Sequence, residues 1–512
     1  MKVSVIDLGF NSVKLVNYDV KEDGCFRAYQ QEGVKVRLGE GMQETGRIAS
    51  EPAARTAEAL RLFRDMIKFD RISHVLPVAT SAVREAANRD EFLSYIERNT
   101  GFRFKVLSEQ EEAIYSYIGA LQSTCIPTAL FFDIGGGSLE LVYTENYSIK
   151  RIKSYPLGAL RLTQMFGKSD GSFSKKAYGR MRRHVEQTLP GVDDLGLSPD
   201  TELVGVGGAL RAIARYDQEV IAYELDKIHN YRMEYSDVSS ISEDLYRMGP
   251  EKIESVKAIG SNRIQTIIAG STAITILMQK MGFENIIVSA QGLREGILSV
   301  YIRDPDGFKE PITAERARSF VLASCRPEVL PARTRSMVMP LQDAGLMRER
   351  EKMILTHAIR ELHTLPPTAN LNNLFYMMID EDNRFLTHRE QLILALSIIY
   401  TRKGKTADWI FSRYRTILES QNKRSIEKIA ACLTLSSIIE RTGIRLQFRV
   451  MKGKKIDMKV TSPSKRYMPQ MLLKNAVANF EQAFGIPVAL KLEVRNQHWH
   501  QGGSKLTERL AI

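Results

Sequence analysis

The sequence predicts an α/β protein with a duplicated unit, followed by a helical domain and a small α+β domain. Two stretches carry this prediction: VSVIDLGFNSVKLV near the start and ALFFDIGGGSLELV from Ala129 each read as an apolar strand, an Asp-x-Gly turn and a second apolar strand. Helical segments alternate with further strands after each stretch, as in α/β folds. A chain of 512 residues is too long for one hydrophobic core, so several domains are expected.

The first unit alternates strands and helices. The helical stretch EPAARTAEALRLFRDMIKF follows Ser50, a candidate N-cap, and has a proline in its first turn. The segment HVLPVATSAVREAANRDEFLSYIERN predicts a strand, a turn and a helix. The strand FRFKVL follows, and a further helix begins near Glu109.

The second unit starts again at Ala129 with the strand-turn-strand device. A helix over 174–190, the strand ELVGVG and helices to about residue 305 are expected after it. The Pro, Gly and charged residues of RDPDGFKEP then indicate a domain boundary.

Beyond this boundary, residues 311–440 have helical periodicity, as in SIEKIAACLTLSSIIER, where Ile426, Ile429 and Leu433 share a face. IRLQFRV and KIDMKV predict a hairpin, a helix ends before Gly485, and VALKLEV predicts a last strand. The predicted domains are 1–120 and 121–305 for the two α/β units, 306–440 for the helical domain and 441–495 for the α+β domain, with a flexible polar tail at 496–512.

Composition excludes several classes of protein. No run of eighteen apolar residues is present, so we expect no membrane span, no signal peptide, no membrane partner and a cytoplasmic location. The four cysteines fit neither a zinc site nor a disulfide framework and are expected to be buried thiols. The eight histidines show no ligand spacing, which disfavours a histidine-based metal hydrolase site. The cysteines are Cys25, Cys125, Cys325 and Cys432.

The net charge of +12 is unevenly distributed. Residues 1–305 carry 38 basic and 40 acidic side chains, whereas residues 401–470 alone hold 17 Lys or Arg against 5 Asp or Glu. Such a surface suits a polyanion: nucleic acid, anionic lipid or long inorganic polyphosphate. The alternative is a solvated positive face without a partner. We define the polyanion track as Lys403, Lys405, Lys423, Arg424, Lys452, Lys454 and Lys455.

The two Asp-x-Gly turns predict a phosphate clamp. Glycine lets backbone N–H groups point outward, and these donors suit phosphate oxygens, while a neighbouring carboxylate can hold Mg²⁺. Three consecutive glycines exceed what a hairpin needs, so a ligand is expected close to the backbone there. Glu140 either points into the site or faces solvent. The expected members are Asp7, Gly9, Asn11 and Ser12 in the first turn, and Asp133, Gly136, Gly137 and Ser138 in the second.

Two further places carry weaker signals. Gly207 and Gly208 lead from a strand into a helix whose N-terminal amides could face an anion, although such joints are also common in packing. Arg84 follows a strand and could bind phosphate in bidentate fashion, or it could pair with Glu85 or Glu91.

An acidic cluster lies at the start of the helix after Ser108. Glu109, Glu111 and Glu112 could be there for the helix dipole alone. Hydrolysis of a phosphoanhydride, however, needs a base that orients and deprotonates water, and a carboxylate opposite the clamp is the natural candidate.

These residues support a family resemblance. Asp7-Leu8-Gly9-Phe10-Asn11-Ser12, RLGEGMQETGRIA, ATSAVREAANRDEF, VLSEQEEA, DIGGGSLELV, GVGGA and GLREG together resemble the exopolyphosphatase and guanosine pentaphosphate phosphatase family across roughly residues 1–300. The resemblance implies an actin-like fold with two ribonuclease H-like domains around a cleft. It also implies hydrolysis of terminal phosphates with Mg²⁺.

Site roles follow from the resemblance by position. Glu112 is similar to the family's catalytic base, and Asp133 and Glu140 to its metal and water ligands. The positions that resemble the family's phosphate contacts are Asp7, Asn11, Ser12, Arg84, Gly136, Gly137, Ser138, Gly207 and Gly208. Two positions depart from the family pattern, since Phe10 stands where Ser is usual and Ala290 where an acidic residue is usual.

The segment 311–440 resembles the helical domain of long family members, which is related to His-Asp phosphohydrolases. His363 is retained, but Thr364 and Thr401 replace its partners, so no metal site is expected there. The domain then serves as structure, as a dimer surface or as a track for polyphosphate. A homodimer is implied by the resemblance.

The sequence therefore predicts an exopolyphosphatase, a phosphoanhydride hydrolase that uses Mg²⁺ and acts on inorganic polyphosphate, without a specific nucleic acid partner. One alternative is a guanosine pentaphosphate 5′-phosphohydrolase. Another is a non-catalytic sensor of polyphosphate or alarmone, which Phe10 and Ala290 motivate.

Overall fold

The computed structural model describes residues 1–22, 24–189, 191–325, 329–365, 370–380, 386–451, 455–462 and 470–494. The predicted tail at 496–512 lies outside these residues. The chain divides into two compact units, Met1–Ala222 with Asp226–Arg326, and Tyr223–Leu225 with Pro327–Ile512. Within the described residues, no helix is both long and apolar enough to cross a membrane.

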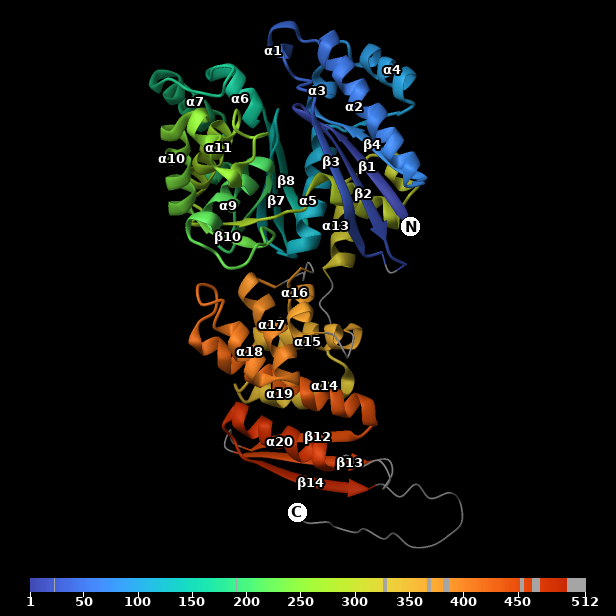
Figure 1. The fold of residues 1–512 in the computed structure, drawn as a ribbon, viewed down its shortest axis with the longest axis vertical. Helices are drawn as coiled ribbons and strands as arrows, with labels where there is room; N and C mark the ends of the chain where they lie inside the picture. The colour runs from blue at the N-terminus through green and yellow to red at the C-terminus, as the bar shows by residue number, and fades with distance from the viewer. Residues whose placement is uncertain are drawn as a thin grey trace. The chain divides into compact units, whose positions relative to one another are not determined.

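The first unit contains two sheets, each with flanking helices (Figure 1). The first sheet has the order β3-β2-β1-β4-β5, in which β1 pairs antiparallel with β2 and parallel with β4. Its elements are β1 (Lys2–Leu8), β2 (Ser12–Val20), β3 (Phe26–Lys35), α1 (Met42–Thr45), α2 (Ser50–Phe69), β4 (His74–Ala79), α3 (Ser81–Glu85), α4 (Arg89–Thr100) and β5 (Lys105–Val106).

The second sheet has the order β10-β11-β9-β6-β7-β8 and repeats the arrangement of the first, since β6 pairs antiparallel with β7 and parallel with β9. Its elements are β6 (Ala129–Ile134), β7 (Leu139–Glu145), β8 (Ser148–Tyr155), α6 (Ala159–Phe166), α7 (Lys175–Thr188), α8 (Val192–Leu195), β9 (Glu202–Gly207), α9 (Gly208–Val220), β10 (Tyr231–Glu234), α10 (Tyr235–Ile253), α11 (Ile267–Met281) and β11 (Asn285–Val288).

Most predicted elements of this unit are present. The two strand-turn-strand stretches are β1–β2 and β6–β7, and the helix expected over 174–190 is α7. One detail of the sequence analysis is wrong: Ser50 is the first residue of α2, Ala49 is the N-cap, and no side chain caps the helix. Ala49 has an extended backbone and serves as the N-cap, so the helix begins one residue earlier than an N-cap at Ser50 predicts.

The cysteines also differ from expectation. Cys125 and Cys325 form a disulfide, with their Cα atoms 5.4 Å apart and 200 residues between them in the chain. Cys25 is exposed, and Cys432 is a buried thiol as expected. The regular spacing of the cysteines does not reveal this pair, because Cys125 and Cys325 meet only when α5 (Glu109–Thr124) and α13 (Ala314–Ser324) pack together.

Two helices join the sheets of the first unit. α5 (Glu109–Thr124) packs on β6, β7 and β8, whereas α12 (Leu293–Arg303) packs on β1. The helices approach each other through glycines: a Cβ on Gly119 would lie 1.9 Å from the carbonyl oxygen of Gly292, and a Cβ on Gly296 would lie 1.9 Å from that of Tyr115. No larger side chain fits between these backbones. α13 (Ala314–Ser324) also packs on α5.

The second unit has helices and one three-stranded sheet with a common apolar core. Ile426, Ile429 and Leu433 are buried on one face of a long helix, as the periodicity predicts. The unit comprises α14 (Ala332–Asp343), α15 (Glu349–Thr364), α16 (Leu371–Asp380), α17 (His388–Arg402), α18 (Gly404–Phe411), α19 (Ser420–Thr442), β12 (Arg445–Met451), β13 (Lys455–Ser462), α20 (Gln470–Phe484) and β14 (Val488–Val494).

The predicted hairpin at the end of the chain is confirmed, because β12 pairs antiparallel with β13. β14 adds to β13 in parallel, which its crossover helix α20 permits. The domain limits 1–120, 121–305, 306–440 and 441–495 stay predictions, as does the relation of the helical part to His-Asp phosphohydrolases. α13 belongs to the first compact unit, although the sequence analysis assigned its residues to the helical domain.

Replacing Gly119 with Ala should destabilise the first unit, because the added methyl group overlaps the Gly292 carbonyl and forces α5 and α12 apart. We expect a loss of about 1–3 kcal/mol in unfolding free energy, the range of overpacked cores. Gly179→Ala is the matched control, since Gly179 is also helical but has open space around its Cα, and Ala there should stabilise by about 0.5–1 kcal/mol. Urea unfolding of both variants measures the difference, and equal effects would contradict the close approach.

Candidate active site

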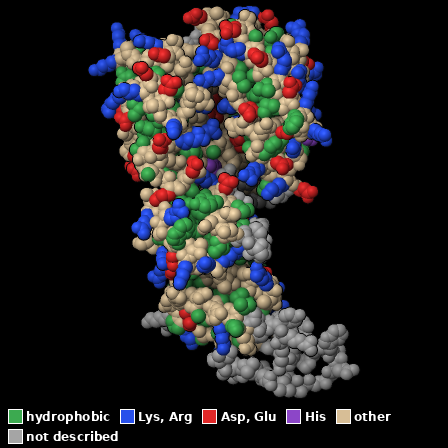
Figure 2. Space-filling model, in the orientation of Figure 1, with side chains coloured by type: hydrophobic (Ala, Val, Ile, Leu, Met, Phe, Trp, Pro, Cys, Tyr) green, Lys and Arg blue, Asp and Glu red, His purple; other side chains and the backbone are tan. Residues whose placement is uncertain are grey.

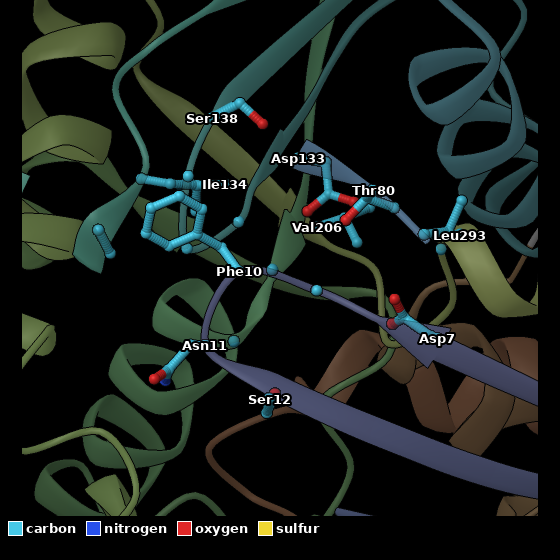
Figure 3. Close-up of a pocket in the computed structure, with 18 of the residues that line it drawn as sticks. Asp7, Phe10, Asn11, Ser12, Thr80, Asp133, Ile134, Ser138, Val206 and Leu293 are labelled. Carbon is cyan, nitrogen blue, oxygen red and sulfur yellow. The ribbon is translucent and has the colours of Figure 1, made fainter. Parts of the chain in front are cut away.

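A pocket in the first unit lies between the two strand-turn-strand devices. Its cavity of about 140 Å³ is lined by residues of both turns. Figure 2 shows the surface hollowed between the two halves of this unit, with Lys and Arg side chains nearby. Figure 3 shows Asp7, Asp133 and Thr80 grouped on one side of the pocket, and the Phe10 ring beside the turn between Ile134 and Ser138.

The two turns have the same construction. Leu8 pairs with Val13 across the first, and Ile134 pairs with Leu139 across the second. Gly9 donates its N–H to the Ser12 carbonyl at 3.1 Å, and Gly135 donates to the Ser138 carbonyl at 3.0 Å. The sequence repeat is therefore a structural repeat.

The carbonyl groups at the tips of both turns accept hydrogen bonds from neighbouring backbone segments. In the first turn, the Phe10 carbonyl accepts from the Gly39 N–H at 3.0 Å, and the Asn11 carbonyl accepts from Val36 and Arg37. In the second, the carbonyls of Gly135, Gly136 and Gly137 accept from backbone N–H groups of residues 158–161 at the start of α6.

The N–H groups at the same tips behave differently. Among the described residues, we find no hydrogen bond donated by the backbone N–H of Phe10, Asn11, Gly136 or Gly137. Each turn thus presents donors with no internal partner beside a carboxylate, an arrangement that binds anions.

Carboxylates occupy one side of the pocket. Asp133 is the next-to-last residue of β6 and accepts a hydrogen bond from the Ser116 hydroxyl of α5 at 2.7 Å. Glu140 is its register partner on β7, is 3% exposed and accepts from Ser154 at 3.3 Å. Glu140 therefore points into the site rather than into solvent. Asp7 and Glu112 also line the pocket.

Glu112 is held by an arginine from the first half of the unit. Its Oε2 accepts from Arg84 Nη1 at 2.9 Å, and the same nitrogen donates to the Leu107 carbonyl at 2.9 Å. Arg84 therefore pairs with neither Glu85 nor Glu91, the partners considered from sequence. Its Nε and Nη2 are buried without a hydrogen-bond partner.

The three glutamates at the start of α5 lie in different surroundings. Glu111 forms a capping box with Ser108 and an ion pair with Lys105 at 3.2 Å. Glu109 is exposed. Only Glu112 reaches the pocket, so the helix-dipole explanation suits two of the three side chains.

Burial shifts the protonation of these carboxyls. It raises the pKa of Glu112 to about 7, outweighing the opposing effect of Arg84. Burial, followed by the charges of Glu112 and Asp133, raises the pKa of Glu140 well above its usual value. Burial also raises the pKa of Asp133, which the Ser116 hydrogen bond opposes. Several carboxyls thus share one water-poor space.

Four basic side chains that the sequence analysis did not identify also line the pocket: Lys14, Arg211, Arg263 and Arg294. Burial and the Arg294 charge lower the pKa of Lys14 to about 7, and the same two causes lower the pKa of Arg211 to about 10. Arg294 is 8% exposed, and its Nη1 has no partner. One signal was available: Lys14 follows Asp7 at the spacing at which Glu140 follows Asp133.

The predicted site residues fall into two groups. Asp7, Gly9, Asn11, Ser12, Glu112, Asp133, Gly136, Gly137, Ser138, Glu140, Gly207 and Gly208 all line the pocket. Arg84 reaches it through Glu112. Gly208 is needed for packing, because a Cβ there would lie 1.9 Å from the Arg263 guanidinium. The catalytic, metal and phosphate roles of these residues stay predictions.

The two departures from the family pattern also line the pocket. Phe10 is 4% exposed. Ala290 offers its carbonyl to Arg211 Nη1 at 3.0 Å. An acidic side chain at this pocket-lining position would add a negative charge near Arg211, so its absence leaves the pocket more positive.

The polyanion track lies in the second unit. Lys403, Lys405 and Arg424 are exposed; Lys423 pairs with Asp408 at 2.9 Å, and Lys455 with Asp457 at 3.5 Å. Lys452 and Lys454 lie outside the described residues, as do the side chains of His363 and Thr364. Among the side chains that are described, no three of His, Cys, Asp or Glu are grouped as a metal site.

Comparison with known proteins covers the first part of the chain. A model described as the Ppx/GppA phosphatase family matches residues 18–302. Exopolyphosphatase 2 of Mycobacterium tuberculosis is 28% identical over 310 residues, which cover 58% of this chain and 97% of that protein. The guanosine-5′-triphosphate,3′-diphosphate pyrophosphatase of Aeromonas hydrophila is 27% identical over 302 residues, which cover 58% of each protein.

Solved structures agree. The Ppx/GppA family member of Aquifex aeolicus is 27% identical with a TM-score of 0.51, covering 60% of this chain and 99% of its own. An exopolyphosphatase from Cytophaga hutchinsonii shares the fold at 23% identity and a TM-score of 0.54, covering 59% of this chain and 98% of its own. The actin-like fold predicted from the resemblance is confirmed for this part of the chain.

Glu112→Gln should change how stability depends on pH. Because burial raises the folded pKa of Glu112 from 4.5 to about 7, the folded chain holds this proton more tightly than the unfolded chain. Wild-type stability should therefore fall, relative to the variant, as pH rises from about 4.5 to about 7, by up to about 3 kcal/mol. Urea unfolding in metal-free buffer at about pH 5 and about pH 7.5 measures this change. The exposed Glu109→Gln should show none, and parallel pH profiles for wild type and Glu112→Gln would contradict the prediction.

Proposed function

Because this chain belongs to the Ppx/GppA phosphatase family, we propose that it is an exopolyphosphatase, which hydrolyses the terminal phosphoanhydride bond of inorganic polyphosphate. The observation that carries the proposal is the position of Glu112, held by Arg84 at 2.9 Å in a pocket that also contains two turns with unpartnered N–H groups. A base and an anion site thus occupy one cavity.

Glu112 is suited to activate water. A carboxyl with a pKa near 7 is partly ionised at neutral pH and accepts a proton more readily than an ordinary glutamate. Arg84 fixes its orientation and keeps two buried nitrogens for the transferring phosphoryl group. The attacking water then loses its proton to Glu112 Oε as the bond to phosphorus forms, and the shortened chain departs on the opposite side.

The basic groups and the turns bind the phosphate chain. N–H donors of the two turns suit the oxygens of the terminal group, and Lys14, Arg211, Arg263 and Arg294 supply positive charge next to them. These groups are preorganised by burial, so they stabilise developing charge without having to displace water. The missing partner of Arg294 Nη1 supports an anionic ligand at this position.

The carboxylates on β6 and β7 are suited to bind Mg²⁺. Asp133 and Glu140 are register partners on adjacent strands, and their buried charges repel each other and that of Glu112. A divalent cation would relieve this repulsion, and Mg²⁺ commonly takes one or two carboxylates together with phosphate oxygens and waters. We propose Asp133 and Glu140 as its protein ligands; the bound ion would offset charge on the phosphoryl oxygens.

Guanosine pentaphosphate is the second candidate substrate. It is favoured by the similarity to the Aeromonas hydrophila enzyme, and it shares the terminal phosphoanhydride chemistry. A sensor that binds polyphosphate without hydrolysis is the remaining alternative. The cytoplasmic location and the homodimer stay predictions.

Glu112→Gln should lower phosphate release from long-chain polyphosphate with Mg²⁺ by about 10²–10⁴-fold, the usual contribution of a general base. Gln keeps a hydrogen-bond acceptor for Arg84 but cannot take the proton. Phosphate release by wild type, Glu112→Gln and the exposed Glu109→Gln is compared, with guanosine pentaphosphate assayed in parallel. Retained activity in Glu112→Gln would refute its role as the base. A folded wild type that binds polyphosphate but releases no phosphate would favour the sensor.

The polyanion track should matter for long chains only. Replacing Lys403, Lys405 and Arg424 together by Ala removes three exposed charges, so the KM for long polyphosphate should rise and its salt dependence weaken, because fewer counterions are released on binding. Tripolyphosphate should be hydrolysed as before. The control is Lys459→Ala, whose side chain pairs with Glu493 at 2.8 Å. Equal effects on short and long substrates would contradict a role for the track.

A further inference from the structure

Phe10 occupies an unusual position for an aromatic residue. It is at the tip of the first turn, and its ring reaches the tip of the second: a Cβ on Gly137 would lie 2.9 Å from the ring, and a Cβ on Gly136 would lie 3.4 Å from Phe10 Cβ. On its other side the ring lies against Gly39, where a Cβ would be 2.1 Å from two ring carbons. The ring therefore fills the space between the two turns, and three glycines accommodate it.

Arg161 lies over this ring. Its guanidinium carbon is 5.4 Å from the centre of the Phe10 ring, a cation–π distance. Arg161 Nε donates to the Gly137 carbonyl at 2.7 Å, so the side chain is fixed to the same turn that the ring contacts. Phe10 belongs to the first strand-turn-strand device and Arg161 to α6, which follows the second.

Glu85 completes the contact between the two halves. Arg161 Nη2 donates to both carboxylate oxygens of Glu85, at 2.8 and 2.7 Å. Glu85 is the last residue of α3, and Figure 1 shows α3 and α6 on facing sides of the first unit. The side chains are 16% and 38% exposed, and Arg161 directly follows the pocket-lining Leu160, so the ion pair lies at the rim of the pocket.

We propose that Phe10, Arg161 and Glu85 form a latch across the mouth of the phosphate pocket, and that Phe10 determines specificity by favouring slender phosphate chains over nucleotide-linked ones. This inference rests on the proposed function and adds the substrate selection of that site.

The size of the cavity supports the latch. At about 140 Å³ it is smaller than the roughly 300–1,000 Å³ of ordinary ligand pockets. A ligand larger than a terminal phosphate group therefore extends past the rim or requires the halves to separate. Separation breaks the ion pair and exposes an aromatic ring that is 4% exposed in this structure.

The shape of the two candidate substrates gives the direction of selection. Inorganic polyphosphate has the same narrow cross-section along its whole length, so it can pass a constricted mouth. Guanosine pentaphosphate has a ribose and a base attached close to its reactive end, so the latch must open further to admit it. The latch therefore penalises the nucleotide more than the linear chain.

The test compares kcat/KM for guanosine pentaphosphate with kcat/KM for tripolyphosphate. Phe10→Ser removes the ring and should raise this ratio on the order of tenfold. Discrimination between substrates changes by about this factor when a pocket loses or gains a small apolar group. Arg161→Gln and Glu85→Gln should each raise it by about two- to fivefold, the range of a partly exposed ion pair. The exchange Glu85→Arg with Arg161→Glu rebuilds the pair and should return the ratio toward the wild-type value, which a general loss of stability would not do.

The matched control is Arg232→Gln, which breaks an ion pair with Glu202 of similar length, 2.9 Å, between two residues that do not line the pocket. Its ratio should equal that of wild type. A ratio within twofold of wild type in Phe10→Ser, or an equal rise in Arg232→Gln, would overturn the proposed selection.

A distance measurement separates failure of the latch from failure of the proposed function. Spin labels at Leu62 of α2 and Met165 of α6, both exposed, report the separation of the halves in a Cys25→Ser background. Without any substrate, Phe10→Ser and Arg161→Gln should broaden and lengthen the distance distribution. An unchanged distribution would overturn the latch. If wild type hydrolyses neither substrate, the proposed function fails, while the distances still decide whether the latch exists.

Discussion

The contact between α5 and α12 is the constraint on which the arrangement of the first unit depends. α5 carries Glu112 in its first turn and rests on the second sheet, whereas α12 rests on β1, which carries Asp7. The backbones meet at Gly119 and Gly296 with no room for a Cβ. Because close-packed interiors transmit small displacements, this contact sets the distance between the base and the turn on the opposite sheet.

The two strand-turn-strand devices of the pocket are built alike but differ in one charged side chain, and this difference explains the chemistry of the pocket. In both turns the tip carbonyls accept backbone hydrogen bonds, whereas among the described residues the tip N–H groups have no partner. The register partner of the aspartate differs between the copies: Lys14 pairs with Asp7 in the first copy, and Glu140 pairs with Asp133 in the second. One copy thereby adds charge for binding phosphate, and the other forms a carboxylate pair suited to a divalent cation.

Several buried guanidinium nitrogens near the pocket have no hydrogen-bond partner, which suits the binding of an anionic ligand. Arg84 Nε and Nη2 and Arg294 Nη1 are buried without partners. Leaving such donors unpaired costs about 1–3 kcal/mol each unless a ligand satisfies them. Phe10 has the opposite character, since its apolar ring is buried against Gly39 and Gly137 and needs no hydrogen-bond partner.

The sequence by itself determined the two strand-turn-strand devices, the glycine turns and their carboxylates, because strand periodicity and the need for glycine in close turns are local properties. It also indicated most site residues, since Asp133, Gly136 and Glu140 are close in the chain. Only the tertiary structure decided that Arg84 pairs with Glu112 rather than Glu85, that Cys125 meets Cys325, and that Lys14, Arg211, Arg263 and Arg294 converge. These contacts join residues from different elements, and no local propensity specifies which of many charged or thiol side chains become neighbours once the helices pack.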